Sequence, residues 1–177
     1  MHLPTLYAEC SDFLAESQKT PLLKNLPVHY DGFKKVKVRK KNKQDAVIEA
    51  FNKSFSQHKN AFQRSVFANG KSSFIVSEDA SFEPFYIFPI NGYKYVYNPV
   101  VTNFANEYKE NIERLTHNIP QSVAIDMVSM VISKSYTDTN LVEGINLGAE
   151  IIIYSIPYYY AIRKSLLDDY SSIDYNI

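Results

Sequence analysis

The chain of 177 residues has few of the residue types that mark several large classes of protein. Its single cysteine, Cys10, excludes an internal disulfide and a cysteine-rich zinc site, and is typical of a reducing compartment. Its five glycines form neither of the glycine-rich patterns that bind nucleotide phosphates. The 19 basic and 19 acidic side chains cancel, so any attraction for a polyanion must come from a local cluster.

The chain also lacks a long hydrophobic run. The most apolar stretch, residues 151–161, is far shorter than the roughly 20 residues that a membrane-spanning helix needs. The first residues have no basic segment followed by an apolar one, so we expect no secretory signal. These features predict a soluble cytoplasmic protein, or a component of a larger assembly, with no membrane contact.

Metal binding is not expected from the histidines. No two of them are four residues apart, and none has a nearby set of acidic residues or cysteine. We therefore expect no metal cofactor. The four histidines are His2, His29, His58 and His117.

What the chain does have is aromatic and aliphatic residues: 14 Tyr, 11 Phe and 45% hydrophobic residues in all. This composition predicts one globular domain in which a sheet contributes heavily. We expect the α+β class, with a mostly antiparallel mixed sheet flanked by helices. Residues 1–32 are expected to form an N-terminal helix and a connector arm, and residues 33–177 the α+β domain.

Hydrophobic spacing and turn residues predict the individual elements. The helices are expected at residues 6–18, 43–57, 103–117, 121–133 and 138–147, the last closed by Gly148 and capped by Asp138 or Thr139. The strands are expected at residues 33–43, 63–70, 85–90, 93–98, 151–154 and 158–162. Asn91-Gly92 stands between two aromatic strands and predicts a hairpin, although Pro89 favours an edge or a bulge.

A basic run lies along the first strand of the expected domain. Seven of the 19 basic residues fall within ten positions, where two valines alternate with basic side chains. Such a run can contact the phosphates of a nucleic acid, or it can be a solvated strand edge that lysines protect from pairing. Arg39 stands out because its planar guanidinium binds phosphate through two hydrogen bonds. The run contains Lys34, Lys35, Lys37, Arg39, Lys40, Lys41 and Lys43, of which Lys35, Lys37, Arg39, Lys40 and Lys41 are the candidate nucleic-acid contacts.

A few other polar residues are placed where chemistry is possible. Glu150 directly precedes an apolar strand, where burial can tune the pKa of a carboxylate. Ser65 lies beside the strand that runs into Asn69-Gly70, where a small polar residue lines a cleft or simply ends a strand. The tyrosines Tyr93 and Tyr95 either stack on a ligand ring or fill the core of the sheet.

Three segments in order carry a family pattern. In the first, Arg39 follows two alternating valines; in the second, a strand reaches an Asn-Gly turn before an aromatic hairpin; in the third, Glu150 opens an isoleucine strand. The segments are KVKVRKKNK, then RSVFANG with YIFPINGYKYVYNP, then GAEIII with IPYYYAI. Together they resemble the three-part signature of the ADP-ribosyltransferase fold, and a group of small proteins of tailed bacteriophages that share it.

This resemblance implies a NAD-dependent mono-ADP-ribosyltransferase. NAD is then the substrate, no metal is needed, and a protein or nucleic acid of the host is the acceptor. The location is then the host cytoplasm or the virion. The implied site residues are Glu150 as the catalytic carboxylate, Arg39 on the phosphates and ribose of NAD, Ser65 and Asn69 in the nicotinamide pocket, and Tyr93 and Tyr95 as stacking rings.

Two departures from the family pattern leave other functions open. Where active members have Ser-Thr-Ser, this chain has Phe67, Ala68 and Asn69, and Gly148 stands where arginine-modifying members have a glutamate. One alternative is a non-enzymatic virion component or a protein that binds a host factor. The other is a nucleic-acid-binding protein that uses the basic run from Lys34 to Lys43.

Overall fold

The computed structural model describes residues 3–40, 45–55, 61–70 and 75–170 of the chain. Its centre is a seven-stranded sheet in which every registered strand pair is antiparallel, in the order β2-β7-β4-β1-β3-β6-β5. Helices pack around this sheet, so the predicted α+β class is confirmed. The strands are β1 (Leu22–Pro27), β2 (Phe33–Lys37), β3 (Val66–Asn69), β4 (Phe82–Pro89), β5 (Lys94–Tyr97), β6 (Glu150–Tyr154) and β7 (Tyr158–Arg163).

Strand β1 lies in the middle of the sheet, between β4 and β3. The sequence predicts that the connector arm, which follows the N-terminal helix and ends at residue 32, contains no strand, and for β1 that prediction is wrong. The prolines misled it because Pro21 precedes the strand and Pro27 ends it, so neither interrupts the ladder. Residue 32, the expected end of the arm, therefore lies between β1 and β2, which belong to the same sheet.

The predicted hairpin at Asn91-Gly92 is also wrong as a strand pairing. Strand β4 pairs with β1 and β7 on its two sides, and β5 pairs with β6 at the far end of the sheet. With both edges of β4 occupied, no position beside it remains for β5. The turn itself forms, with Gly92 at φ 79°, but it leads the chain across the sheet instead of back along β4.

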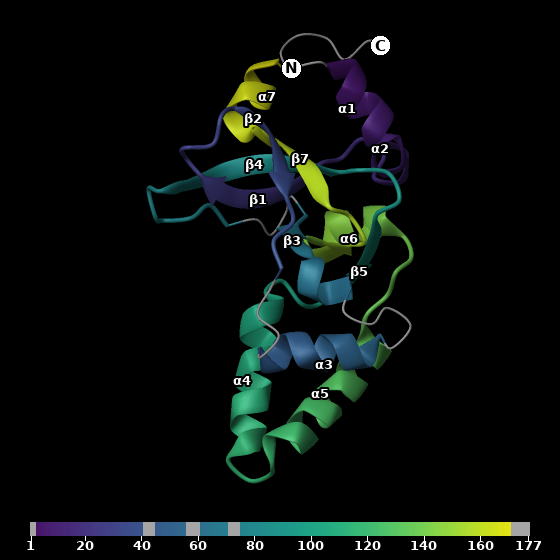
Figure 1. The fold of residues 1–177 in the computed structure, drawn as a ribbon, viewed down its shortest axis with the longest axis vertical. Coiled ribbons are helices and arrows are strands. Elements are labelled where there is room, and N and C mark those ends of the chain that lie inside the picture. The colour runs from purple at the N-terminus through teal and green to yellow at the C-terminus, as the bar shows by residue number, and fades with distance from the viewer. Residues whose placement is uncertain (1–2, 41–44, 56–60, 71–74, 171–177) are drawn as a thin grey trace.

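Apart from α6, which lies beside the sheet, the described α-helices form two groups at opposite ends of the molecule, as Figure 1 shows. Helices α3, α4 and α5 pack together below the sheet, and α1, α2 and α7 lie at the other end near both termini. The helices are α1 (Leu3–Glu9), α2 (Ser11–Glu16), α3 (Ala46–Ser54), α4 (Phe104–Thr116), α5 (Gln121–Ser135), α6 (Leu141–Leu147) and α7 (Lys164–Tyr170), with the 3-10 helix η2 at Ala61–Arg64.

Most helix predictions are confirmed, with corrections at the ends. Helices α4 and α5 form on either side of Pro120 as expected, and Gly148 closes α6 at φ 74°. The N-cap of α6 is Asn140, not Asp138 or Thr139, because its side chain accepts from the N–H of Glu143. The amide of Asn140 also donates to the carboxylate of Glu143 at 2.8 Å, which completes a reciprocal cap.

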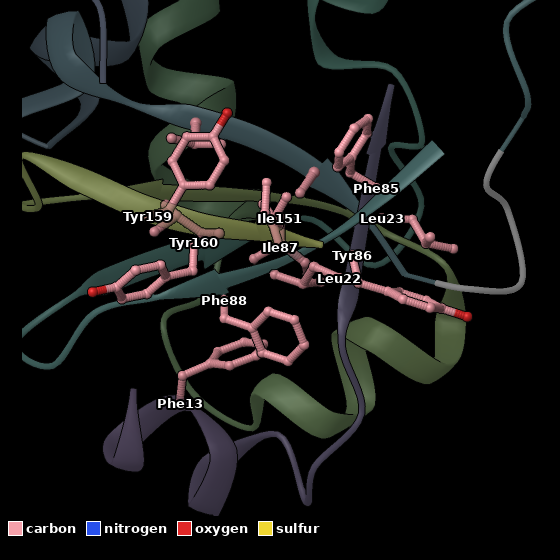
Figure 2. Packing of buried hydrophobic residues seen from close by; sticks show 14 of the residues in the cluster. Phe13, Leu22, Leu23, Phe85, Tyr86, Ile87, Phe88, Ile151, Tyr159 and Tyr160 are labelled. Atoms are coloured by element: carbon pink, nitrogen blue, oxygen red, sulfur yellow. The ribbon is translucent and has the colours of Figure 1, made fainter. Parts of the chain in front are cut away.

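The N-terminal segment forms two short helices instead of the single helix predicted at 6–18. They meet at Cys10, whose φ of −119° is not helical. Phe13 of α2 then packs edge-on against Phe88 of β4, with ring centroids 6.3 Å apart (Figure 2). Leu6 of α1 and Phe13 of α2 belong to the same buried cluster as Phe88, so α1 and α2 cover one face of the sheet.

A second core joins α3, α4 and α5 to β6. The Phe51 ring in α3 lies 4.3 Å from that of Phe104 and 4.7 Å from that of Phe62, both nearly perpendicular to it. Ile152 and Tyr154 of β6 are buried against this cluster. Within the residues that the structure describes, none of the helices is both long enough and apolar enough to span a bilayer.

Candidate functional site

The most exposed of the predicted site residues lie on β2, the outermost strand at one end of the sheet, and on the residues that directly follow it. Strand β2 pairs only with β7 in the described sheet, and the N–H of Val38 continues that pairing by donating to the carbonyl of Pro157 at 2.9 Å. We call the described part of the basic run the basic edge: Lys34, Lys35, Lys37, Arg39 and Lys40. Lys41 and Lys43 lie outside the described residues.

The side chains of the basic edge differ in how far they are engaged. Lys34 is partly buried, and its ammonium lies 3.9 Å from the centroid of the Tyr30 ring. The ammonium of Lys35 lies 3.6 Å from the centroid of the Tyr158 ring and 4.0 Å from the carboxylate of Glu9. These contacts orient both lysines against the sheet surface while one side of each remains in solvent.

The other three members of the basic edge are exposed. Lys37, Arg39 and Lys40 are classed as exposed, and no ion pair of theirs occurs among the described residues. Burial raises the pKa of Tyr159, and the positive charge of Arg39 opposes that shift. Their charge therefore faces water and is available to an anion.

Glu150 is placed at a helix end. Its carboxylate accepts a hydrogen bond of 2.6 Å from the backbone N–H of Phe104, the first residue of α4. A carboxylate in this position is stabilised by the partial positive charge of the helix N-terminus. Asn69 lies directly opposite Glu150 in the β3–β6 ladder and donates to the carbonyl of Thr102 at 3.1 Å. The two residues together fasten the loop that leads into α4.

A partly buried lysine that the sequence did not single out lies near this pair. Lys24 of β1 donates from Nζ to the carbonyl of Phe67 at 2.8 Å. Burial lowers the pKa of Lys24, and the nearby negative charge of Glu150 opposes that shift. The sequence signal is one lysine within an apolar stretch, but the flanking prolines predict that this stretch is a connector.

The structure does not bring Arg39 to Glu150. The basic edge passes Pro157, in the turn that follows the last residue of β6, whereas Glu150 is the first residue of β6. The two ends of that five-residue strand are about 13 Å apart at the usual rise of an extended chain. Glu150 therefore lies at the start of β6, whereas Arg39 follows β2 near the turn beyond the other end of β6.

The remaining candidates are engaged elsewhere. Ser65 is buried and donates to the carbonyl of Phe62 at 2.8 Å. The hydroxyls of Tyr93 and Tyr95 both donate to the carboxylate of Glu16 in α2, and burial is the main cause that raises the pKa of each tyrosine. In the β5–β6 ladder Tyr95 lies opposite Ile153, whose side chain points to the other face from that of Glu150.

A second carboxylate holds two tyrosines in the same way. Glu9 of α1 accepts hydrogen bonds from the hydroxyls of Tyr158 at 2.9 Å and Tyr160 at 2.7 Å. Residues two apart on a strand point to the same face, which is why both pairs of hydroxyls converge on one glutamate. The tyrosine-rich segments thus attach the N-terminal helices to the sheet.

Among the described residues, no group of three His, Cys, Asp or Glu side chains is arranged to hold a metal ion. Comparison with known proteins finds no matching family model, no matching curated protein and no matching solved structure. The function is therefore argued from the placement of these side chains.

Proposed function

We propose that this chain is a binding protein that contacts the phosphate backbone of a nucleic acid through its basic edge. The observation that carries the proposal is the placement of Lys35, Lys37 and Arg39 on the outermost strand and its continuation, with all three exposed. Positions two apart on a strand share a face and are spaced by roughly 6.6 Å. Lys35 and Lys37 therefore point to the same side of β2, and the exposed charges of Arg39 and Lys40 follow directly after the strand ends.

Electrostatics supports the same role. Phosphate contacts by Lys and Arg supply the sequence-independent part of nucleic-acid affinity by releasing condensed counterions. The acidic group that contacts the basic edge, Glu9, also accepts two tyrosine hydroxyls and lies 4.0 Å from Lys35 alone. The charges of Lys37, Arg39 and Lys40 are thus not neutralised by the described residues, and Arg39 can contact a phosphate through two hydrogen bonds.

The experiment is fluorescence anisotropy with labelled single-stranded and duplex oligonucleotides. We compare the wild type with the triple variant Lys37→Ala, Arg39→Ala, Lys40→Ala. The matched control is Lys94→Ala, Lys109→Ala, Arg114→Ala, which also removes two lysines and one arginine from exposed positions, on β5 and α4. We expect the first variant to lose most of the affinity and the control to keep it; equal affinities would contradict the proposal.

A second candidate function is NAD-dependent mono-ADP-ribosylation of a protein or nucleic-acid acceptor. The observation that favours it is the direct pairing of Glu150 with Asn69, two residues that the resemblance assigns to one pocket. Calorimetry with NAD on the wild type, Glu150→Gln and Arg39→Ala tests it. NAD binding that both substitutions weaken would favour the enzyme, whereas no binding at millimolar NAD would remove it and leave nucleic-acid binding.

A further inference from the structure

Helix α5 has an apolar face in solvent in addition to the face that it buries. The exposed large hydrophobic side chains of the described residues number twelve, and four of them are on α5. The four are Val123, Met127, Met130 and Val131, which are 44%, 48%, 59% and 56% exposed. The exposed apolar area is therefore concentrated on one helix, which is typical of an interaction surface.

The spacing of these residues places them on one stripe. Relative to Val123 they stand at positions i+4, i+7 and i+8, the spacing of one face of an α-helix. The opposite side of α5 is buried against α3 and α4 through Ala124, Ile125, Val128 and Ile132. A helix that is apolar on both sides is typical of one that is covered on both sides.

The charges along the stripe are self-complementary. Asp126 and Lys134 are each four residues from Met130, one on either side, so all three lie along one helical row. Both charged side chains are exposed; Asp126 also pairs with Lys53 at 2.9 Å, and its side chain remains 62% exposed. Among the described residues Lys134 has no ion pair.

We propose that α5 packs antiparallel against α5 of a second copy of this chain, across a two-fold axis at Met130. In that arrangement each Asp126 lies opposite Lys134 of the second copy, so two ion pairs form at once. The apolar stripe is buried against itself, and the two helix dipoles run in opposite directions. Because the charges on α5 complement those of an antiparallel α5, we expect a second copy of this chain to cover the apolar stripe.

Sedimentation velocity over a concentration series tests the proposal. We expect the wild type to approach twice the chain mass of 20.4 kDa, and Met130→Lys to remain at the chain mass because it brings two lysines together at the axis. Val100→Lys is the control, since Val100 is 85% exposed and lies outside α5, and it should associate like the wild type. Circular dichroism checks that each variant is folded.

A charge exchange tests the antiparallel register. Lys134→Asp alone should weaken association by about tenfold or more, because it places two carboxylates opposite each other. The double variant Asp126→Lys, Lys134→Asp should restore it. The proposal is overturned if the wild type is monomeric up to millimolar concentration, if Met130→Lys still dimerises, or if the exchange does not restore association.

Discussion

Glu150 accepts a hydrogen bond from the N–H of Phe104, which joins the first residue of β6 to the first residue of α4. The carboxylate thereby stabilises the helix N-terminus, and its charge acts on the partly buried Lys24. These contacts give the glutamate that resembles a catalytic residue a structural role at the junction of β3, β6 and α4. This role predicts that replacing Glu150 lowers the free energy of unfolding.

Glu150→Gln is expected to lower the free energy of unfolding by about 1–3 kcal/mol, because it removes the charge that stabilises the α4 terminus and offsets Lys24. Urea denaturation at neutral pH measures the change. Glu110→Gln, an exposed position on the same helix, is the control and should change stability by less than about 0.5 kcal/mol. A Glu150→Gln protein as stable as the wild type would contradict this role.

The attachment of α1 predicts a pH dependence. Hydrogen bonds from Tyr160 and Tyr158 lower the pKa of Glu9 below its usual value of 4.5. Because the folded-state pKa is the lower one, the stabilisation is present in full above pH 4.5 and is lost as the pH falls through the folded-state value. Glu9→Gln should therefore be less stable than the wild type at neutral pH, with a difference that shrinks on acidification.

Denaturation curves of the wild type and Glu9→Gln at several pH values measure that difference. Glu113→Gln is the control, since Glu113 makes only an exposed ion pair with Lys109. A difference between wild type and Glu9→Gln that stays constant from neutral pH to below pH 4 would show that the two tyrosine bonds do not depress the pKa of Glu9.

The packing of α6 on β3 predicts a strong effect at Gly70. A Cβ at this position would lie 2.1 Å from the backbone carbonyl oxygen of Ile145, which has little freedom to move. Gly70→Ala is expected to lower the free energy of unfolding by about 1–3 kcal/mol. Gly92→Ala is the comparison: its Cβ would meet nothing within 4 Å, and only the φ of 79° opposes it, so we expect a loss of about 1 kcal/mol. Equal losses would contradict the contact.

Local sequence signals predict the helices and strands better than they predict which strands pair with each other. Asn91-Gly92 forms a turn, but Asn91 uses its side chain to join the N-terminal helices: its amide donates to the carbonyl of Ala8, and its oxygen accepts from the N–H of Asp12. Which strand lies beside β4 depends on β1 and β7, which are distant in sequence. The period-two alternation of a strand shows which residues share a face, but it does not show which other strand lies beside it.

The same limit applies to the candidate site. The exposure of Lys35 and Lys37 follows from alternation along β2, which the sequence displays directly. The separation of Arg39 from Glu150 and the approach of Lys24 to Glu150 depend on strand order. Strand order is set by tertiary packing, so residues implied together by a resemblance need not meet in the fold.

The salt dependence of nucleic-acid binding tests the central claim most directly. For the wild type we expect the logarithm of the association constant to fall linearly with the logarithm of salt concentration, by about 0.7 to 0.9 for each phosphate contacted. Removing Lys37, Arg39 and Lys40 together should reduce that slope by about 2 to 3, whereas the Lys94, Lys109 and Arg114 control should leave it unchanged. An affinity that is absent at low salt, or a slope that the basic edge does not change, would contradict the account.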